Sequence, residues 1–411
     1  MSEEGAANVF KCFELELNAG KNPIFHGGEL ITGNLKVELK RPMTIQVIKL
    51  QFKGRAACTN NDSTKGGEIE KVYFDRDFIL LERPPGRPEP GHFPWIANFV
   101  YSLPFECPLP LGCPTSYEGS HAFIRYHVRA TIVEDNGNES HEYTIKKPLM
   151  VVAPVDPIPE VASHPVGASE SVSFGGCCCR GKLSAEAQLP KSTYFPGETV
   201  IGTLKIDNRH PRHIVDQVEV RLVDRTMRVD ASAGAPSTPR TLIHHKLDKN
   251  NVVKSKSSMH KDDVIFLQIP PVVPSTPGAA AAAFGSDVYS MTPGEKAPSL
   301  ISKLLESPGS ATLRFRKQPF IRVDYAIQVS LGSQLLLELP ITINALPIEG
   351  EGIAYESFAI GEQSIVESDE ANKLRLGDGF VFTPRYQVLV NAQQLSARTI
   401  NGPTTENGAP R

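Results

Sequence analysis

Residues 25–37, Phe-His-Gly-Gly-Glu-Leu-Ile-Thr-Gly-Asn-Leu-Lys-Val, are matched by residues 195–206, Phe-Pro-Gly-Glu-Thr-Val-Ile-Gly-Thr-Leu-Lys-Ile. Identical residues recur at a constant spacing of 169 positions: Glu29 and Glu198, Gly33 and Gly202, Leu35 and Leu204, Lys36 and Lys205. In both copies a Gly-Glu pair precedes the run and is typical of a turn, because Gly tolerates a positive φ. The repeat indicates two copies of one module.

Alternating hydrophobic residues follow both copies of the repeat. The apolar positions are Ile45, Val47, Leu50 and Phe52 in the first copy, and Val215, Val218, Val220 and Leu222 in the second. A period of two residues predicts β-strands. Short strands separated by turn residues, with few helical periods, favour antiparallel packing. We therefore predict an all-β protein built from two tandem immunoglobulin-like antiparallel β-sandwiches.

A second pair of windows supports the duplication and locates an insertion. Residues 123–130, Phe-Ile-Arg-Tyr-His-Val-Arg-Ala, resemble residues 320–327, Phe-Ile-Arg-Val-Asp-Tyr-Ala-Ile. Tyr126 and Tyr325 are 199 positions apart, which is 30 more than the spacing of the first repeat. The second copy must contain extra residues. Residues 277–318, with five consecutive alanines, are predicted to be a disordered insertion that contains a short helix near 300–305.

These observations divide the chain into four parts. Residues 1–153 form the N-terminal sandwich, and residues 177–347 form the C-terminal sandwich with its insertion. Between them, residues 154–176 are rich in Pro, Ser and Gly and predict an extended connector. Residues 348–411 are acidic and lack a strand pattern, so we expect a largely disordered tail.

Composition excludes several classes of protein. The 411 residues carry a net charge of -3 and a pI near 6.4, whereas nucleic-acid binders usually have a marked basic excess. The chain has neither a secretory signal nor an apolar run long enough to span a membrane, so we expect a cytoplasmic protein. Seven cysteines, an odd number without such a signal, predict reduced thiols rather than disulfides.

A cysteine cluster lies inside the one window that approaches a nucleotide-binding motif. Residues 176–183 resemble a phosphate-binding loop, but Leu183 stands where Ser or Thr would hold magnesium, so we predict no nucleotide. Cys177, Cys178 and Cys179 are candidates for lipidation. Three adjacent cysteines do not fit a zinc site, and partly buried structural thiols are the alternative.

No motif in the chain assembles a nucleophile, a base and an orienting group. We therefore predict a protein that is not an enzyme and needs no cofactor or metal. An enzyme with a dispersed active site is the alternative.

A basic stretch runs from Arg240 to Lys261 and contains one acidic residue, Asp248. It could bind anionic lipid or a phosphorylated peptide through its lysines, and a solvated loop is the alternative. The candidate residues are Lys246, Lys249, Lys254, Lys256 and Lys261.

Several motifs, taken in order, resemble the arrestins, and most of all the α-arrestins, or arrestin domain-containing proteins. They are the Phe-x-Gly-Gly-Glu-x-x-x-Gly turn at 25–33, Pro-Thr-Ser-Tyr-Glu-Gly at 114–119, Tyr-Phe-Pro-Gly-Glu at 194–198 and Ile-Pro-Pro-Val-Val-Pro-Ser-Thr at 269–276. The resemblance implies two curved sandwiches joined by a connector. It also implies a cytosolic adaptor that binds tails of membrane receptors or transporters and links them to endocytic sorting or ubiquitination, with recruitment to the plasma membrane and endosomes.

The tail departs from the α-arrestin pattern. The resemblance implies Pro-Pro-x-Tyr motifs that bind WW domains of ubiquitin ligases, but the nearest sequence is Thr383-Pro384-Arg385-Tyr386. Pro384 and Tyr386 are the candidate contacts, and a chance match is the alternative. A second reading of the function is a phosphate-gated arrestin that desensitises a receptor. That group uses buried charge pairs as a latch, and residue spacing does not identify such a pair here.

Overall fold

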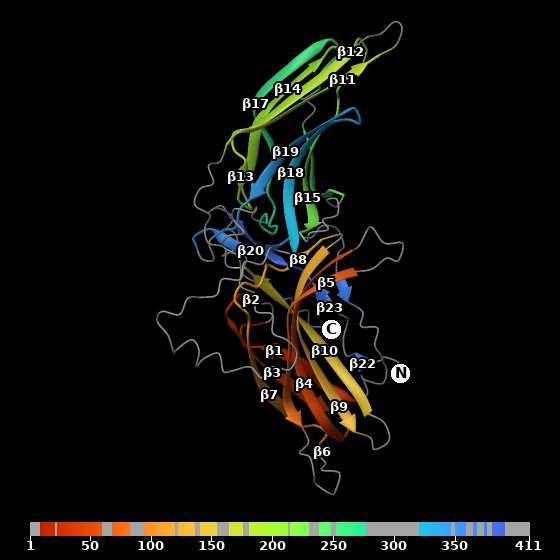
Figure 1. Cartoon of the computed structure of the whole chain (residues 1–411), viewed down its shortest axis with the longest axis vertical. Coiled ribbons are helices and arrows are strands. Elements are labelled where there is room, and N and C mark those ends of the chain that lie inside the picture. The colour runs from red at the N-terminus through yellow and green to blue at the C-terminus, as the bar shows by residue number, and fades with distance from the viewer. Residues whose placement is uncertain are drawn as a thin grey trace, which may run out of the picture.

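The computed structural model describes residues 9–20, 23–59, 68–82, 94–119, 122–135, 140–153, 164–175, 181–212, 214–229, 238–247, 252–276, 320–346, 350–358, 365–367, 374–375 and 380–390. Every regular element within these ranges is a strand, in agreement with the predicted all-β class. The strands form two sandwiches that lie end to end along the long axis (Figure 1).

The N-terminal sandwich packs a small sheet on a large one. The small sheet has the order β1 (Phe10–Leu17), β3 (Leu30–Leu39) and β7 (Val100–Pro108). The large sheet has the order β2 (Ile24–His26), β10 (Ser140–Val152), β9 (Ala122–Asp135), β4 (Met43–Thr59) and β5 (Glu68–Glu82). Two short strands, β6 (Pro94–Trp95) and β8 (Tyr117–Glu118), pair with β4 and β9 respectively.

The C-terminal sandwich repeats this plan. One sheet has the order β11 (Val166–Phe174), β12 (Gly181–Leu189), β14 (Thr199–Asn208) and β17 (Ser257–Gln268). The other has the order β13 (Thr193–Tyr194), β19 (Leu335–Ile343), β18 (Ile321–Leu331), β15 (Val218–Arg228) and β16 (Arg240–Lys246).

The sequence repeat corresponds to one turn built twice. Gly28 and Gly197 both have positive φ, 89° and 95°. Glu29 accepts the backbone N–H of His26 through a carboxylate oxygen at 2.8 Å, and Glu198 accepts that of Phe195 at 3.0 Å. Glycine supplies the left-handed conformation and glutamate satisfies the turn's free donor, so both residues of the Gly-Glu pair are needed.

The tyrosines of the second repeat also occupy equivalent places. The Tyr126 hydroxyl donates to the carbonyl oxygen of Pro114 at 2.7 Å, and that of Tyr325 donates to Val273 at 2.6 Å. One residue of each proline-containing segment then bonds the neighbouring strand: Ser116 Oγ accepts from Val151 N at 3.0 Å, and Ser275 Oγ accepts from Ile343 N at 2.8 Å. Segments 114–116 and 273–275 are therefore structural counterparts, although their sequences do not align clearly.

The glycines of the first repeat lie where a side chain does not fit. A Cβ at Gly33 would meet the carbonyl oxygen of Glu16 and the ring of Phe105. A Cβ at Gly202 would meet the carbonyl oxygen of Gln188, and the ring of Phe266 at 3.3 Å. In both sandwiches an aromatic ring covers the glycine, so the first repeat preserves a packing contact.

We expect Gly33→Ala and Gly202→Ala each to lower the free energy of unfolding by about 1–3 kcal/mol, because backbone must move to admit the methyl group. Urea denaturation of each variant measures the change. Gly167→Ala is the control, because its Cβ would meet nothing nearer than Gln188 Cγ at 3.4 Å. Equal stability of all three variants would show that the two sites relax freely.

The predicted connector is too long. Residues 166–174, assigned to it from composition, form strand β11 in unbroken antiparallel register with β12. Its alternate residues Val166, Ala168, Val172 and Phe174 pack against the core, while Gly and Ser occupy the positions between them. Those small residues gave the segment a linker-like composition and concealed its period of two.

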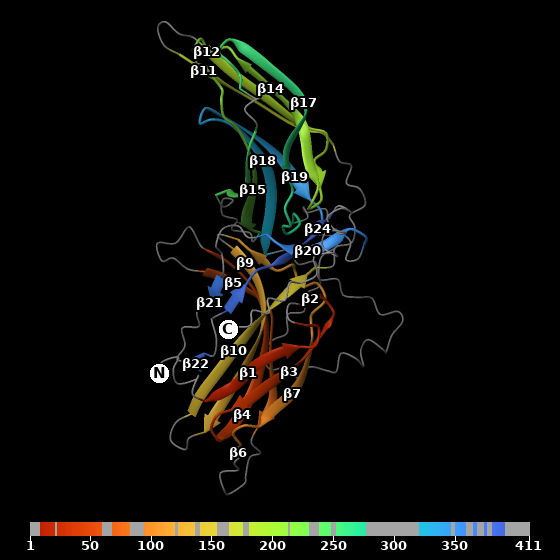
Figure 2. The ribbon, with the colours of Figure 1, turned by 180° about the vertical axis from the view of Figure 1, so that it is seen from behind.

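The expectation of a tail without fixed structure is wrong for several short segments. Strand β20 (Ile353–Ser357) pairs with β24 (Arg385–Leu389), and this pair lies between the two sandwiches (Figure 2). Further along the tail, β21 (Ile365–Glu367) pairs with β23 (Phe380–Phe382), and β22 (Leu374–Arg375) adds to β10. The acidic average of the tail hid these strands. The predicted insertion at 277–318 lies outside the described residues.

Candidate functional site

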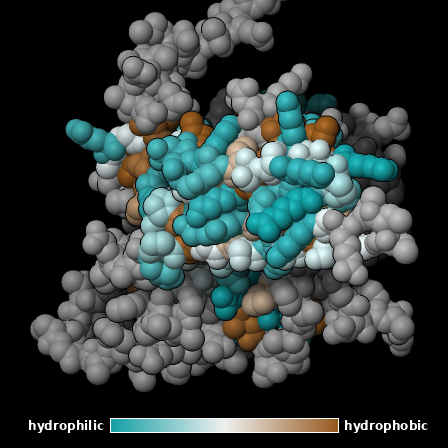
Figure 3. Space-filling model, turned by 90° about the horizontal axis from the view of Figure 1, so that it is seen from above, coloured by the Kyte–Doolittle hydropathy of each residue, from teal (hydrophilic) through white to brown (hydrophobic). Residues whose placement is uncertain are grey.

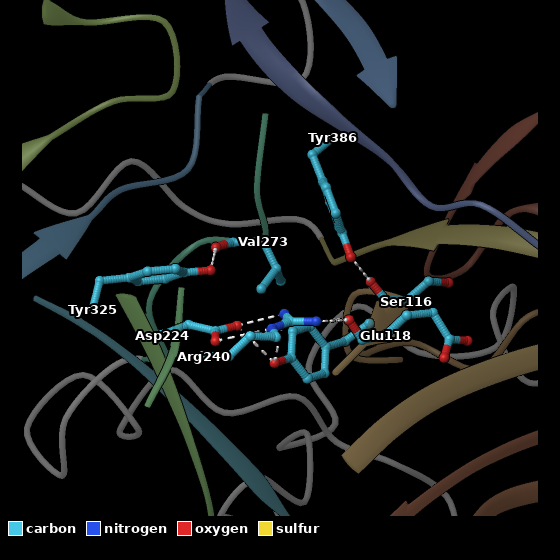
Figure 4. Close-up of polar contacts among 8 residues, drawn as sticks. Ser116, Glu118, Asp224, Arg240, Val273, Tyr325 and Tyr386 are labelled. Carbon is cyan, nitrogen blue, oxygen red and sulfur yellow. Dashed lines mark hydrogen bonds and ion pairs between the residues drawn. The ribbon is translucent and has the colours of Figure 1, made fainter. Parts of the chain in front are cut away.

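The two sandwiches meet at a buried ion pair. Asp224, from β15, is 2% exposed, and Arg240, from β16, is 14% exposed. Arg240 Nη2 is 2.5 Å from Asp224 Oδ2, and Arg240 Nε is 3.1 Å from Asp224 Oδ1 (Figure 4). The geometry is bidentate, which is the strongest form of an arginine–carboxylate contact.

Arg240 also reaches across to the N-terminal sandwich. Its Nη1 donates to the carbonyl oxygen of Glu118 at 3.2 Å, and its Nη2 to the hydroxyl of Tyr117 at 3.4 Å. Burial alone would lower the pKa of Arg240, but the hydrogen bond to the Asp224 carboxylate and the negative charge of that carboxylate outweigh burial and raise this pKa. The guanidinium therefore stays charged and ties β8 to β15.

Two tyrosines complete the contact. Tyr117 donates its hydroxyl to Asp224 Oδ2 at 3.1 Å, and burial together with that carboxylate raises its pKa well above the usual range. Tyr386, from tail strand β24, donates to the carbonyl oxygen of Ser116 at 3.0 Å. We call this set the junction cluster: Ser116, Tyr117, Glu118, Asp224, Arg240 and Tyr386.

The contacts of the junction cluster are structural: they hold the two sandwiches together. Its only anionic side chain in contact with the arginine is Asp224, and that carboxylate is already satisfied by Arg240 and Tyr117. Across the described ranges, no three His, Cys, Asp or Glu side chains gather in a way that could hold a metal ion. Because Arg240 bonds groups from both sandwiches, an anion that competed for it would weaken the junction.

The alternation of β15 contains a signal for Asp224 that our sequence analysis missed. Val218, Val220 and Leu222 point into the core, and Asp224 continues the same period of two. A carboxylate at a core-facing position must have a buried partner. On sequence alone, we grouped Arg240 with the basic stretch, but in the structure it is largely buried and paired with Asp224.

Tyr386, predicted to contact a WW domain, is buried. Its exposed fraction is 9%, and the strand is fixed by the Leu389 N–H, which donates to the Pro196 carbonyl oxygen at 2.9 Å. A Cβ at Gly197 would collide with the backbone of Leu389, so the repeat's second turn packs directly on this strand. Pro384 is half-buried. The WW contact stays a prediction, and it requires the tyrosine to leave this place.

The predicted lysines are spread over several elements. Lys246 is exposed at the end of β16, opposite Glu219 of β15. Lys254 and Lys256 lie close together in the turn before β17, both exposed, and Lys261 is half-buried within β17. Lys249 and the three candidate cysteines, Cys177, Cys178 and Cys179, lie outside the described residues.

Buried cysteines allow a test of the N-terminal sandwich. Burial raises the pKa of Cys107 to about 11 and of Cys113 to about 12, while Cys12 is only half-buried. At pH 8 about one Cys107 in a thousand is then thiolate, the reactive form. We expect iodoacetamide to modify Cys12 well before Cys107 or Cys113, as site-resolved mass spectrometry can follow. In denaturant the three cysteines should react at similar rates. Similar rates in the native protein would contradict the burial of Cys107 and Cys113.

The fold and the junction cluster define a tandem β-sandwich protein whose halves are held together by a buried ion pair. Family comparison agrees with this class. A family model described as "Arrestin (or S-antigen), N-terminal domain" matches residues 13–157, and one described as "Arrestin (or S-antigen), C-terminal domain" matches residues 179–348. The chain belongs to the arrestin family.

Curated relatives are arrestin domain-containing proteins. The chain is 23% identical over 379 residues to "Arrestin domain-containing protein 4" of Homo sapiens, which covers 86% of this chain and 76% of that protein. It is 24% identical over 355 residues to "Arrestin domain-containing protein 17" of Caenorhabditis elegans, covering 82% and 70% respectively. The chain is therefore like the α-arrestins, as its motifs predicted. In the described part of the chain no helix has the length and hydropathy needed to cross a bilayer.

Proposed function

We propose that the protein is a cytoplasmic adaptor that binds the cytosolic tails of membrane receptors or transporters and links them to endocytic sorting or ubiquitination. One observation carries the proposal: both arrestin sandwiches are present, and a satisfied ion pair, rather than a reactive constellation, occupies their junction. Open sheet edges suit such a partner, because an extended peptide can add to an edge through its backbone.

Binding to tail peptides tests the adaptor. The intact chain would be measured against immobilised peptides of cytosolic tails, each paired with a peptide of scrambled sequence. We expect selective binding to some tails, with the scrambled partner at least about tenfold weaker, a difference of about 1.4 kcal/mol. A panel in which no tail exceeds its scrambled control would contradict the proposal.

A phosphate-gated arrestin is the second candidate, and the junction cluster is the observation that favours it. Asp224 and Arg240 form the kind of buried charge pair that an incoming phosphate could disrupt by competing for the guanidinium. Gating predicts at least about tenfold tighter binding of phosphorylated tails than of the same tails unphosphorylated. Replacing Asp224→Asn should reduce that preference. Equal affinity for both forms favours the ungated adaptor.

An anionic membrane surface is a further proposed partner, through Lys254 and Lys256. Each lysine near such a surface contributes up to about 1 kcal/mol, so Lys254→Glu with Lys256→Glu should weaken vesicle binding more than tenfold. Co-sedimentation with phosphatidylserine vesicles measures it. Unchanged binding of the double variant would exclude this role for the turn.

A further inference from the structure

The edge strands of the two sandwiches differ in how they are protected from pairing with another chain. Strand β5 carries charged residues at nearly half of its 15 positions, and β7 contains Pro104 and Pro108. The pairing of β1 has a bulge next to Phe10, that of β16 has one opposite Leu222, and that of β17 has two. Charges, prolines and bulges are the usual devices that keep an edge from accepting a further strand.

Strand β11 has neither proline nor bulge. All nine of its residues, Val166–Phe174, stay in register with β12, and Glu170 is its single charged residue. Among the described residues no strand pairs with its other side, so the sheet order ends at β11. Of the long edges that the structure describes, this one is the least protected.

The two faces of β11 define what an added strand must look like. Ala168 and Val172 pack against the core, and between them, two residues from each, lies Glu170, whose own side chain is exposed. The opposite face carries only Gly and Ser, which leave room for any small or polar side chain. A matching strand would therefore alternate, with apolar residues continuing the core-facing row.

Glu170 selects among the possible occupants. It is exposed, it sits at the middle of the strand, and among the described residues it makes no ion pair. In a two-fold pairing of two copies centred on this residue, carboxylates would face each other, which is unfavourable. A lysine or arginine in the partner would instead pair with it. The face of the C-terminal sandwich that Figure 3 shows is mostly hydrophilic, with only scattered apolar residues.

We propose that the free edge of β11 binds an extended segment of another protein by strand addition, and that this segment has the pattern apolar–x–basic–x–apolar. Cytosolic segments beside membrane-spanning helices are enriched in Lys and Arg, so they can supply the basic residue of this pattern. The identification of the source as a membrane-protein tail rests on the proposed function, whereas the edge and its preference for a basic residue rest on the structure.

The test uses the intact chain and a fluorescent nine-residue peptide of alternating valine and threonine with lysine at its centre. A second peptide has glutamate at its centre. The lysine peptide should bind about five- to tenfold more tightly than the glutamate peptide, and Glu170→Lys should reverse the order. The control is Glu106→Lys, an exposed glutamate on edge strand β7, which should leave both affinities unchanged. Hydrogen exchange should slow within residues 166–174 when the lysine peptide binds.

Several results would overturn the proposal. They are the absence of peptide binding, an order of affinities that ignores position 170, and protection confined to another strand. A concentration-dependent dimer that Glu170→Lys alters would mean that a second copy, rather than a partner, takes the edge. If membrane-protein tails bind normally to Glu170→Lys, tails do not occupy this edge, so the proposed occupant is wrong while the adaptor stands. If the lysine peptide binds but no tail does, the adaptor fails and the edge stands.

Discussion

Replacing Arg240 with alanine should lower the free energy of unfolding by about 3–5 kcal/mol, the largest effect of any single change proposed for this chain. The substitution leaves the carboxylate of Asp224, which is 2% exposed, without its cation, and it also removes the donors to the N-terminal sandwich. Urea denaturation followed by far-UV circular dichroism reports both sandwiches. Fluorescence of Trp95, the single tryptophan, reports the N-terminal one, so the two probes show whether the halves still unfold together.

The control for this prediction is Arg225→Ala. Arg225 forms a bidentate pair with Glu338, with both nitrogen–oxygen distances at 2.6 Å, but the two side chains are 29% and 37% exposed. Water screens such a pair, so its loss should cost no more than about 1 kcal/mol. Equal effects of the two alanine variants would show that burial of the Asp224 pair does not matter.

A double variant separates the two sources of the effect. Asp224→Ala combined with Arg240→Ala removes the stranded carboxylate as well as its partner, and should recover part of the stability lost in Arg240→Ala alone. If the double variant recovers no stability, the loss in Arg240→Ala comes from the bonds to Glu118 and Tyr117, that is, from the contact between the sandwiches.

The architecture was predictable because each repeated residue performs a local task. Glu29 and Glu198 each accept a hydrogen bond from the backbone N–H three residues earlier, and Gly33 and Gly202 each leave space for an aromatic ring. Because the two copies make the same local contacts, they keep the same residues at the same spacing. Such tasks involve neighbouring strands of one sandwich. They can be inferred from a single sequence once its two copies are aligned.

The site was less predictable because its partners are far apart in the chain. Tyr117 and Arg240 are separated by 123 positions, and Ser116 and Tyr386 by 270. No period or spacing connects them, and Arg240 sits in a run of other basic residues that suggested exposure. Only the core-facing position of Asp224 in its strand indicated a buried cation, without saying which one.

The tail strand β24 connects the contact between the two sandwiches with the proposed recruitment of a ubiquitin ligase. Tyr386, the residue predicted to bind a WW domain, is seated in the junction cluster and bonded to Ser116. Because the two sandwiches bury it, any WW domain that bound Tyr386 would compete with the junction for the same side chain. Ligase recruitment would then depend on release of the strand, which an event at the junction could promote.

WW binding by the intact chain should be at least about 30-fold weaker than binding by a free peptide of residues 375–395, if freeing the strand costs about 2 kcal/mol. The reason is that only the fraction of molecules with Tyr386 released can bind. Titration of one labelled WW domain with the chain and with the peptide measures the ratio. Tyr386→Ala should abolish binding in both.

Val390→Asp distinguishes two reasons for weak WW binding by the chain: burial of Tyr386, or a low intrinsic affinity of the Thr383–Tyr386 sequence. Val390 is 9% exposed and lies beyond the Thr383–Tyr386 sequence, so a charge there should loosen β24 without touching the WW contact. We expect WW affinity to rise at least about tenfold in the intact chain and to stay unchanged in the peptide. Equal affinity of unmodified chain and peptide would mean that the tyrosine is not held in its seat. A peptide that binds no WW domain, with or without Tyr386, would identify the sequence as a chance match and leave Tyr386 a purely structural residue of the junction.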